Sequence, residues 1–201
     1  MSRSLCCALA LVSFASGIAC ISPAPPPVTR FYAPPLAAFP AAPVDAAAET
    51  GNAAAVRLLP VRSAAQLREP IAWSSSVAER GQREYARWSE RPAVYVERSL
   101  RAALLARGDL VRTESLEGPQ LAVELLQFEE RRGSTTEAVV VLWGSLSTPA
   151  GHLLLDQPFE EVRVLEGRSP SPEALALALG PALDRAVQRL LDAAALALAD
   201  S

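Results

Sequence analysis

Lysine is absent from the sequence, and histidine occurs once, at position 152. Without a lysine amine the chain cannot build a Walker-type phosphate loop, a Schiff base or a Ser-Lys dyad. A zinc site of histidines and cysteines needs three or four such ligands, and a catalytic triad needs a histidine between a nucleophile and an acid. His152 follows a Pro-Ala-Gly turn, where a solvated histidine is ordinary. We therefore expect no catalytic residue, no metal site, no cofactor and no enzymatic activity.

Cysteine is also scarce, with only Cys6, Cys7 and Cys20 in the chain. The first two lie in an apolar stretch over residues 5–18, which is too short to cross a bilayer because a spanning helix needs roughly 20 residues. A weakly positive start and small residues before Cys20 complete the pattern of a cleaved signal peptide. Cleavage would leave Cys20 as the only thiol, so an intramolecular disulfide is impossible. This layout is typical of a bacterial lipoprotein in which Cys20 carries the lipid.

An ordinary secretory signal remains an alternative, because Gly17 stands where the lipoprotein pattern usually has leucine. Small residues at Gly17 and Ala19 also suit the general signal peptidase, which would release a soluble periplasmic protein. Lipidation of Cys20 is favoured because a lone thiol in an oxidising compartment needs a reason, and because proline-rich residues 22–27 would form a stiff spacer. Ile21 is not the aspartate that signals inner-membrane retention in enterobacterial lipoproteins. We therefore expect a palmitate-type anchor in the outer membrane, with the protein facing the periplasm.

Proline and alanine dominate the next stretch, and large apolar groups are few there. The predicted organisation is a signal peptide over residues 1–19, then the lipidated Cys20 and a Pro/Ala-rich tether over 20–55, with a possible first strand near Phe31. One domain follows over residues 56–201. The chain after the signal has 18 arginines against 22 carboxylates. This mildly acidic balance gives no electrostatic footprint for nucleic acid or for anionic lipid headgroups.

Short apolar runs predict three early strands, which we interpret as a small antiparallel meander, over residues 56–61, 71–77 and 82–88. Alternation at Leu121, Val123 and Leu125 predicts a later strand. Residues 138–146 are apolar on both faces and should form a central strand, joined to the previous one by a hairpin at 129–136. Residues 152–164 predict another strand, which Pro158 restricts to an edge or a bulge.

Two helices are predicted by apolar residues at helical spacing. The first is capped by Ser89 and ends at Gly108, and Ser171 caps the second. The second carries a long stripe in which we expect a kink, or a second helix starting, at Pro181. The stripe is either a core face or a groove for an acyl chain, and it consists of Leu175, Leu179, Leu183, Val187, Leu190, Ala194 and Leu198. The fold class is α/β: a single domain with a mainly antiparallel sheet and two principal helices on one side.

Carboxylate pairs and aromatic residues are the remaining candidates for chemistry. Neighbours on a strand point to opposite faces, so neither the pair at 129–130 nor the pair at 160–161 can converge on one substrate atom. A solvated hairpin end is the interpretation we favour for them. The aromatic residues are expected to serve mostly as core or rim packing, and they are Trp73, Tyr85, Trp88 and Tyr95.

Three segments resemble the ABC-type transport auxiliary lipoproteins, a PqiC-like family. Residues 67–73 (Leu-Arg-Glu-Pro-Ile-Ala-Trp) match a segment that ends in a short strand, and residues 85–92 (Tyr-Ala-Arg-Trp-Ser-Glu-Arg-Pro) match an aromatic strand closing on a Trp-x-x-x-Pro element. Residues 100–108 match the helix that follows. Arg30-Phe31-Tyr32 is similar to the family's opening strand, so the resemblance covers roughly residues 31–198. An alanine-rich insertion at 41–55 departs from the pattern.

The resemblance implies a non-enzymatic lipoprotein of an envelope lipid-transport system that helps maintain membrane integrity. Its implied partners are an MCE-domain protein and an ABC permease, together with the membrane through its lipid anchor. Self-association into a homo-oligomer is left open. The alternative is an envelope lipoprotein that scaffolds or activates a cell-wall synthase. A set of genes for a permease, an ATPase and an MCE protein alongside this one would separate the two.

Overall fold

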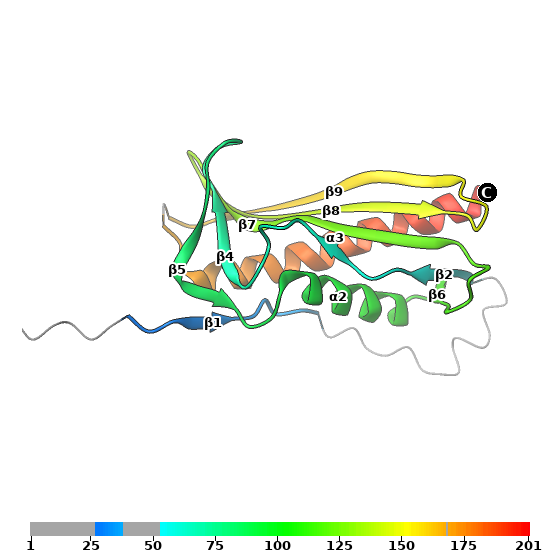
Figure 1. The fold of residues 1–201 in the computed structure, drawn as a ribbon, viewed down its shortest axis with the longest axis horizontal. Coiled ribbons are helices and arrows are strands. Elements are labelled where there is room, and N and C mark those ends of the chain that lie inside the picture. Colours follow the sequence, from blue (N-terminus) through cyan, green and yellow to red (C-terminus); the bar gives the residue numbers. More distant parts are fainter. Residues whose placement is uncertain (1–26, 38–52, 168) are drawn as a thin grey trace, which may run out of the picture.

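The structure is a computed structural model that describes residues 27–37, 53–167 and 169–201 (Figure 1). The predicted signal peptide, Cys20 and most of the predicted tether fall outside these residues. Two helices lie on one side of a mixed nine-stranded sheet. The strands are β1 (Arg30–Tyr32), β2 (Ala54–Leu58), β3 (Arg62–Ser63), β4 (Pro70–Ser74), β5 (Arg80–Trp88), β6 (Leu110–Arg112), β7 (Gln120–Arg132), β8 (Thr136–Ser147) and β9 (Leu153–Leu165), and the helices are α2 (Pro92–Ala106) and α3 (Pro172–Ala199).

The backbone of the sheet is an antiparallel meander of the three longest strands, β7, β8 and β9. Strand β8 lies between the other two, which confirms its predicted central place, and β9 pairs only with β8. Pro158 is therefore on an edge strand, one of the two places to which the sequence restricted it. The predicted hairpin over 129–136 is wrong in extent, because β7 continues to Arg132 and only 133–135 form the turn.

Three short strands share the other edge of β7. In chain order, β2, β3 and β4 each run parallel to it and pair with successive stretches of it. The predicted early antiparallel meander is therefore right for β4 and β5 only, since β2 pairs with β6 and β7 instead. Strand β2 ends just before Pro60, which has no N–H with which to continue a ladder.

Helix α2 confirms the predicted first helix but not its cap. The helix begins at Pro92, a residue suited to the first turn, and Arg91 occupies the N-cap position without a side-chain hydrogen bond. The hydroxyl of Ser89 instead lies 2.9 Å from the phenol oxygen of Tyr95. Tyr95, on the first helical turn, thus binds the Ser89 hydroxyl that was predicted to cap the helix.

Helix α3 is one continuous helix of 28 residues that includes Pro181, so the two-helix alternative is wrong. Ser171 caps it as predicted, with its hydroxyl accepting a hydrogen bond from the N–H of Ala174 at 3.0 Å. Pro181 is exposed, whereas Leu179 and Leu183 on either side are fully buried. Burial of the apolar face on both sides of the proline holds the helix together across it. Within the described ranges, no helix combines the length and the hydropathy needed to cross a bilayer.

The segment of residues 27–37 is attached to the domain at both of its ends. Strand β1 pairs in parallel with β5, and the N–H of Ser89 donates to the carbonyl of Tyr32 at 2.8 Å. The chain then crosses α3, where the N–H of Ala37 donates to Asp184 at 2.9 Å. The other carboxylate oxygen of Asp184 accepts from Ser99 of α2. The predicted strand near Phe31 is thus part of the domain edge.

Candidate interaction surface

The two faces of the long meander have different surroundings, because α2 and α3 cover only one of them (Figure 1). Residues that point toward the helices are buried, including Leu142 and Leu146 of β8. Gly144 lies between them, and a Cβ there would meet the Leu190 side chain at 2.9 Å. The opposite face, here called the outer face, carries the alternate residues of the same strands. Around Trp143 the described residues of this face, such as Ala122, Glu124 and Ser145, are half-buried or exposed.

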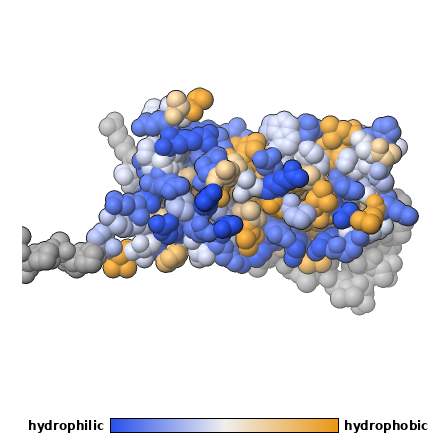
Figure 2. Space-filling view, viewed as in Figure 1, coloured by the Kyte–Doolittle hydropathy of each residue, from blue (hydrophilic) through white to orange (hydrophobic). Residues whose placement is uncertain are grey.

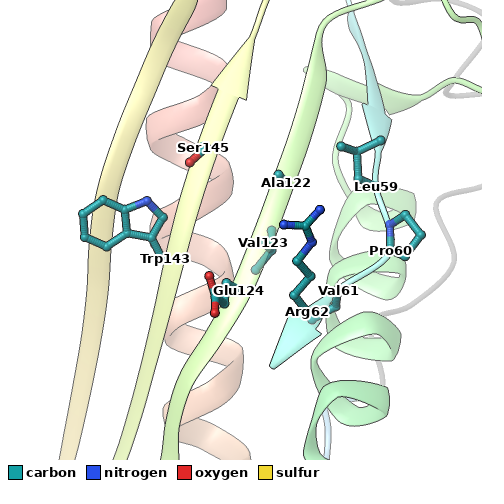
Figure 3. Close-up of a pocket in the computed structure, with 9 residues that line it drawn as sticks. All are labelled: Leu59, Pro60, Val61, Arg62, Ala122, Val123, Glu124, Trp143 and Ser145. Carbon is teal, nitrogen blue, oxygen red and sulfur yellow. The ribbon is translucent and has the colours of Figure 1, made fainter. Parts of the chain in front are cut away.

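A cavity of about 570 Å³ opens on the outer face between the β2–β3 connection and strands β7 and β8. Apolar groups form most of its lining, and two charged side chains join them (Figure 3). The lining consists of Leu59, Pro60, Val61, Arg62, Ala122, Val123, Glu124, Trp143 and Ser145. Trp143 borders the cavity with its indole directed toward β9 (Figure 3), and tryptophan is enriched among the residues that contribute most to the affinity of protein interfaces.

The indole of Trp143 is fixed by β9. Its Nε1–H donates to Oδ1 of Asp156 at 2.7 Å, and the hydroxyl of Ser145 donates to the same oxygen at 2.5 Å. These bonds stabilise the ionised carboxylate and hold the pKa of Asp156 below its usual value, with the Ser145 bond as the larger cause and the Trp143 bond second. Since the carboxylate stays charged at neutral pH, the ring is held in one orientation at the cavity wall.

Arg62 and Glu124 are partners in the parallel pairing of β3 with β7, and both are exposed. Within the described part of the chain, neither makes an ion pair. Figure 3 shows both side chains at the cavity between the β2–β3 connection and Trp143. Arg62 and Glu124 thus offer one charge of each sign, next to the apolar lining, to a partner that carries complementary charges. This arrangement suits recognition of a protein surface.

The described residues offer few groups that could act in catalysis. No group of three histidine, cysteine or carboxylate side chains is placed to hold a metal ion in the ranges that the structure describes. His152 is exposed in the turn before β9, and its backbone N–H donates to the Thr148 hydroxyl at 3.1 Å. Its side chain lies on neither wall of the outer-face cavity.

The carboxylate pair at 129–130 lies on opposite faces of β7, as the strand period predicts, but its predicted solvation is wrong. Glu129 and Glu130 are each only 1% exposed. Glu130 forms ion pairs with Arg83 at 2.8 Å and with Arg132 at 3.0 Å. Glu129 accepts a hydrogen bond from Ser74 at 2.8 Å, and its second oxygen has no partner among the described residues. Arg83, which is distant in the sequence, and the nearby Arg132 supply the charge that the buried Glu130 needs.

The pair at 160–161 has one buried and one exposed member. Glu161 is buried beneath α3 and pairs with Arg189 at 2.8 Å, whereas Glu160 is exposed and pairs with Arg131. The solvated interpretation therefore holds for Glu160 and is wrong for Glu161. Each carboxylate is thus paired with an arginine of this chain.

Of the aromatic residues singled out in the sequence, two form the predicted core. Trp88 packs edge-on against Phe128, with ring centroids 5.2 Å apart, and Tyr95 lies against both. Trp73 is half-buried under the guanidinium of Arg132, which lies 4.3 Å from its ring centroid. Tyr85 is exposed on β5. Trp143 was not among the predicted residues. It stands between the inward-facing Leu142 and Gly144, and this alternation alone places it on the outer face of β8.

The apolar stripe of α3 is a core face. Six of its seven members are fully buried, against the sheet and α2, and Leu198 is partly buried. The sheet therefore occupies the space that an acyl chain would need.

Comparisons with known proteins identify the family of this chain. Residues 36–192 match the family model for the ABC-type transport auxiliary lipoprotein component, which spans more than half of the chain. The chain belongs to this family. The predicted resemblance is thereby confirmed, and it places the protein with accessory components of ABC-type transporters. A comparison with curated proteins finds no significant match to this auxiliary component.

Solved structures share the fold of this auxiliary component at low sequence identity. A Xanthomonas campestris protein of family DUF330 has a TM-score of 0.66 at 17% identity, covering 86% of this chain and 96% of its own. A hypothetical protein from Chlamydia trachomatis has a TM-score of 0.55 at 9% identity, covering 74% of this chain and 99% of its own. These similarities show that the whole domain has a known fold, and they carry no information about substrate.

Proposed function

We propose that this protein is the non-enzymatic, lipid-anchored accessory of an MCE-type ABC system that moves lipids across the bacterial envelope. In this proposal acyl chains on Cys20 hold it in the outer membrane, and the domain faces the periplasm. Membership of the transport auxiliary family is the observation that carries the proposal. The sequence supports a binding role, since the chain has no lysine and a single histidine.

The outer face is the surface we assign to the transporter's periplasmic MCE protein. Its cavity joins a fixed tryptophan, an apolar floor and two unpaired charges of opposite sign, and the helices leave it uncovered. Truncation of a central tryptophan commonly removes a large share of binding energy. Contacts at the rim of the cavity should matter less than Trp143.

Complementation of a deletion strain tests this function. Expression of Cys20→Ala and of Trp143→Ala should leave the envelope permeability defect uncorrected, because the first loses the anchor and the second loses the docking contact. His152→Ala should restore the barrier fully, as the wild type does. Loss of function in His152→Ala, at normal protein level and fold, would show that the protein performs chemistry and would overturn the proposal.

A further inference from the structure

The chain enters the domain at one end of the molecule. Val28 and Arg30 line a surface hollow together with Pro172, the first residue of α3. Arg83 of β5 reaches the same end, where its guanidinium donates to the carbonyl of Pro170 at 2.8 Å. Thr136 and Leu165 are paired there as well, so the β7–β8 turn and the β9–α3 connection lie at this end, here called the entry end (Figure 1).

Covalent geometry orients the entry end toward the membrane. The ten residue steps from Cys20 to Arg30 span at most about 36 Å when fully extended. Helix α3 starts at the entry end and has 28 residues, so it is about 42 Å long. If Cys20 is anchored, as proposed above, the tether is too short for the molecule to invert and place the far end of α3 at the bilayer. The entry end is then held closer to the bilayer than the far end of α3.

A cavity of about 530 Å³ opens at this end, between the tip of the β4–β5 hairpin and the β7–β8 turn. Three arginines line it against one carboxylate, Glu137. Arg131 is held by Glu160 at 2.8 Å and by Glu137 at 3.4 Å. Arg132 donates through Nε and one terminal nitrogen to Glu130, at 3.0 and 3.1 Å, which leaves its other terminal nitrogen uncommitted. Both guanidiniums are thus held in place by carboxylates, and each keeps N–H groups that can donate to a further acceptor.

Arg80 is the uncompensated charge of the cavity. It is exposed, and it makes no ion pair in the part of the chain that the structure describes. Glu79, which precedes it on the same hairpin, accepts a hydrogen bond from the Ser75 hydroxyl. Hydroxyls of the β7–β8 turn add further donors, because Ser134 and Thr135 also line the cavity. Converging guanidinium and hydroxyl donors are the usual surroundings of a phosphate group.

Val77 forms the tip of the β4–β5 hairpin and is 99% exposed. The upper-left projection of the space-filling view, where this tip lies, ends in an apolar group (Figure 2). An apolar side chain that projects from a polar loop beside arginines has the composition of a segment that sits at a membrane interface.

The acidic balance of the whole chain predicts no attraction to anionic headgroups, but this cavity gathers three arginines against one carboxylate. We propose that the entry end binds the phosphate of an anionic phospholipid headgroup in this cavity, with Arg80 as its principal ligand and Val77 entering the interface. The orientation rests on the proposed anchoring of Cys20, whereas the headgroup contact is a property of the folded domain. The anchor and the headgroup site would then hold the domain upright, so that the outer face stands clear of the membrane.

Vesicle co-sedimentation of the unacylated protein tests the site. The mature chain with Cys20→Ala should bind vesicles of phosphatidylglycerol and phosphatidylcholine more tightly than vesicles of phosphatidylcholine alone, and added salt should weaken that binding. Arg80→Ala in the same background should lower the affinity for the anionic vesicles about fivefold. Val77→Asp should lower it as well. Arg112→Ala removes the same charge from β6, near the opposite end, and should leave the affinity unchanged.

The matched variants distinguish a site from general charge attraction. No preference of the unacylated wild type for anionic vesicles would overturn the proposal. Equal losses in Arg80→Ala and Arg112→Ala would overturn it too, because net charge alone would then explain the binding. Neither outcome bears on the transporter contact, which the complementation by Trp143→Ala tests separately.

Discussion

At the scale of single residues, positions that look unremarkable in the sequence are fixed by contacts from distant segments. Gly180 is the clearest case, because a Cβ placed there would lie 2.1 Å from the carbonyl oxygen of Pro35. Glycine inside a helix normally costs stability, so its presence in α3 needs a reason. The close passage of the N-terminal segment supplies that reason. Nothing in the local sequence could have indicated it, since the two residues are far apart along the chain.

Gly180→Ala should therefore destabilise the domain, although the same change in an unobstructed helix gains about 1 kcal/mol. The new methyl group must displace the Pro35 backbone, and overpacking of this kind costs about 1 to 3 kcal/mol. Denaturant unfolding measures the difference. Gly108→Ala is the control, because its Cβ would meet no atom within 4 Å and should leave stability almost unchanged. A Gly180→Ala protein as stable as the wild type would contradict the described docking of residues 34–37.

At the scale of elements, patterns local to a segment were enough to predict the long strands and both helices. The alternation at Leu121, Val123 and Leu125 gave the correct inward face of β7, since all three are buried against the helices. Local pattern did not reveal that β2 and β3 pair with β7, or that Glu129 and Glu130 are buried. Both depend on partners distant in sequence, such as Arg83, and periodicity carries no information about such partners.

Helix α2 gives the element-scale prediction. Leu100 is fully buried, so Leu100→Ala should lower the free energy of unfolding by about 2 to 5 kcal/mol through lost burial and the cavity left behind. Leu105 is 69% exposed on the same helix, and Leu105→Ala should change it by less than about 0.5 kcal/mol. Urea titrations of the two variants provide the comparison. Similar midpoints for both would mean that the inner face of α2 is not in the core.

At the scale of the whole molecule, the fold separates three roles. The helices and the inner face of the sheet form the core. In our proposals the entry end faces the membrane and the outer face binds a protein partner. The family and the single α/β domain were within reach of the sequence, because the segments at 67–73 and 85–92 are continuous. The candidate docking cavity was not, because it joins Trp143 of β8 to residues of the β2–β3 connection that pattern alone could not bring together.

Co-purification from membranes tests the central claim most directly. A tagged wild-type protein, extracted in mild detergent, should carry the cognate MCE protein and permease with it. Trp143→Ala should lose both at the same expression level, while the exposed control Leu105→Ala should retain them. Recovery of a cell-wall synthase in place of the MCE protein, or of neither, would contradict the proposed role in lipid transport.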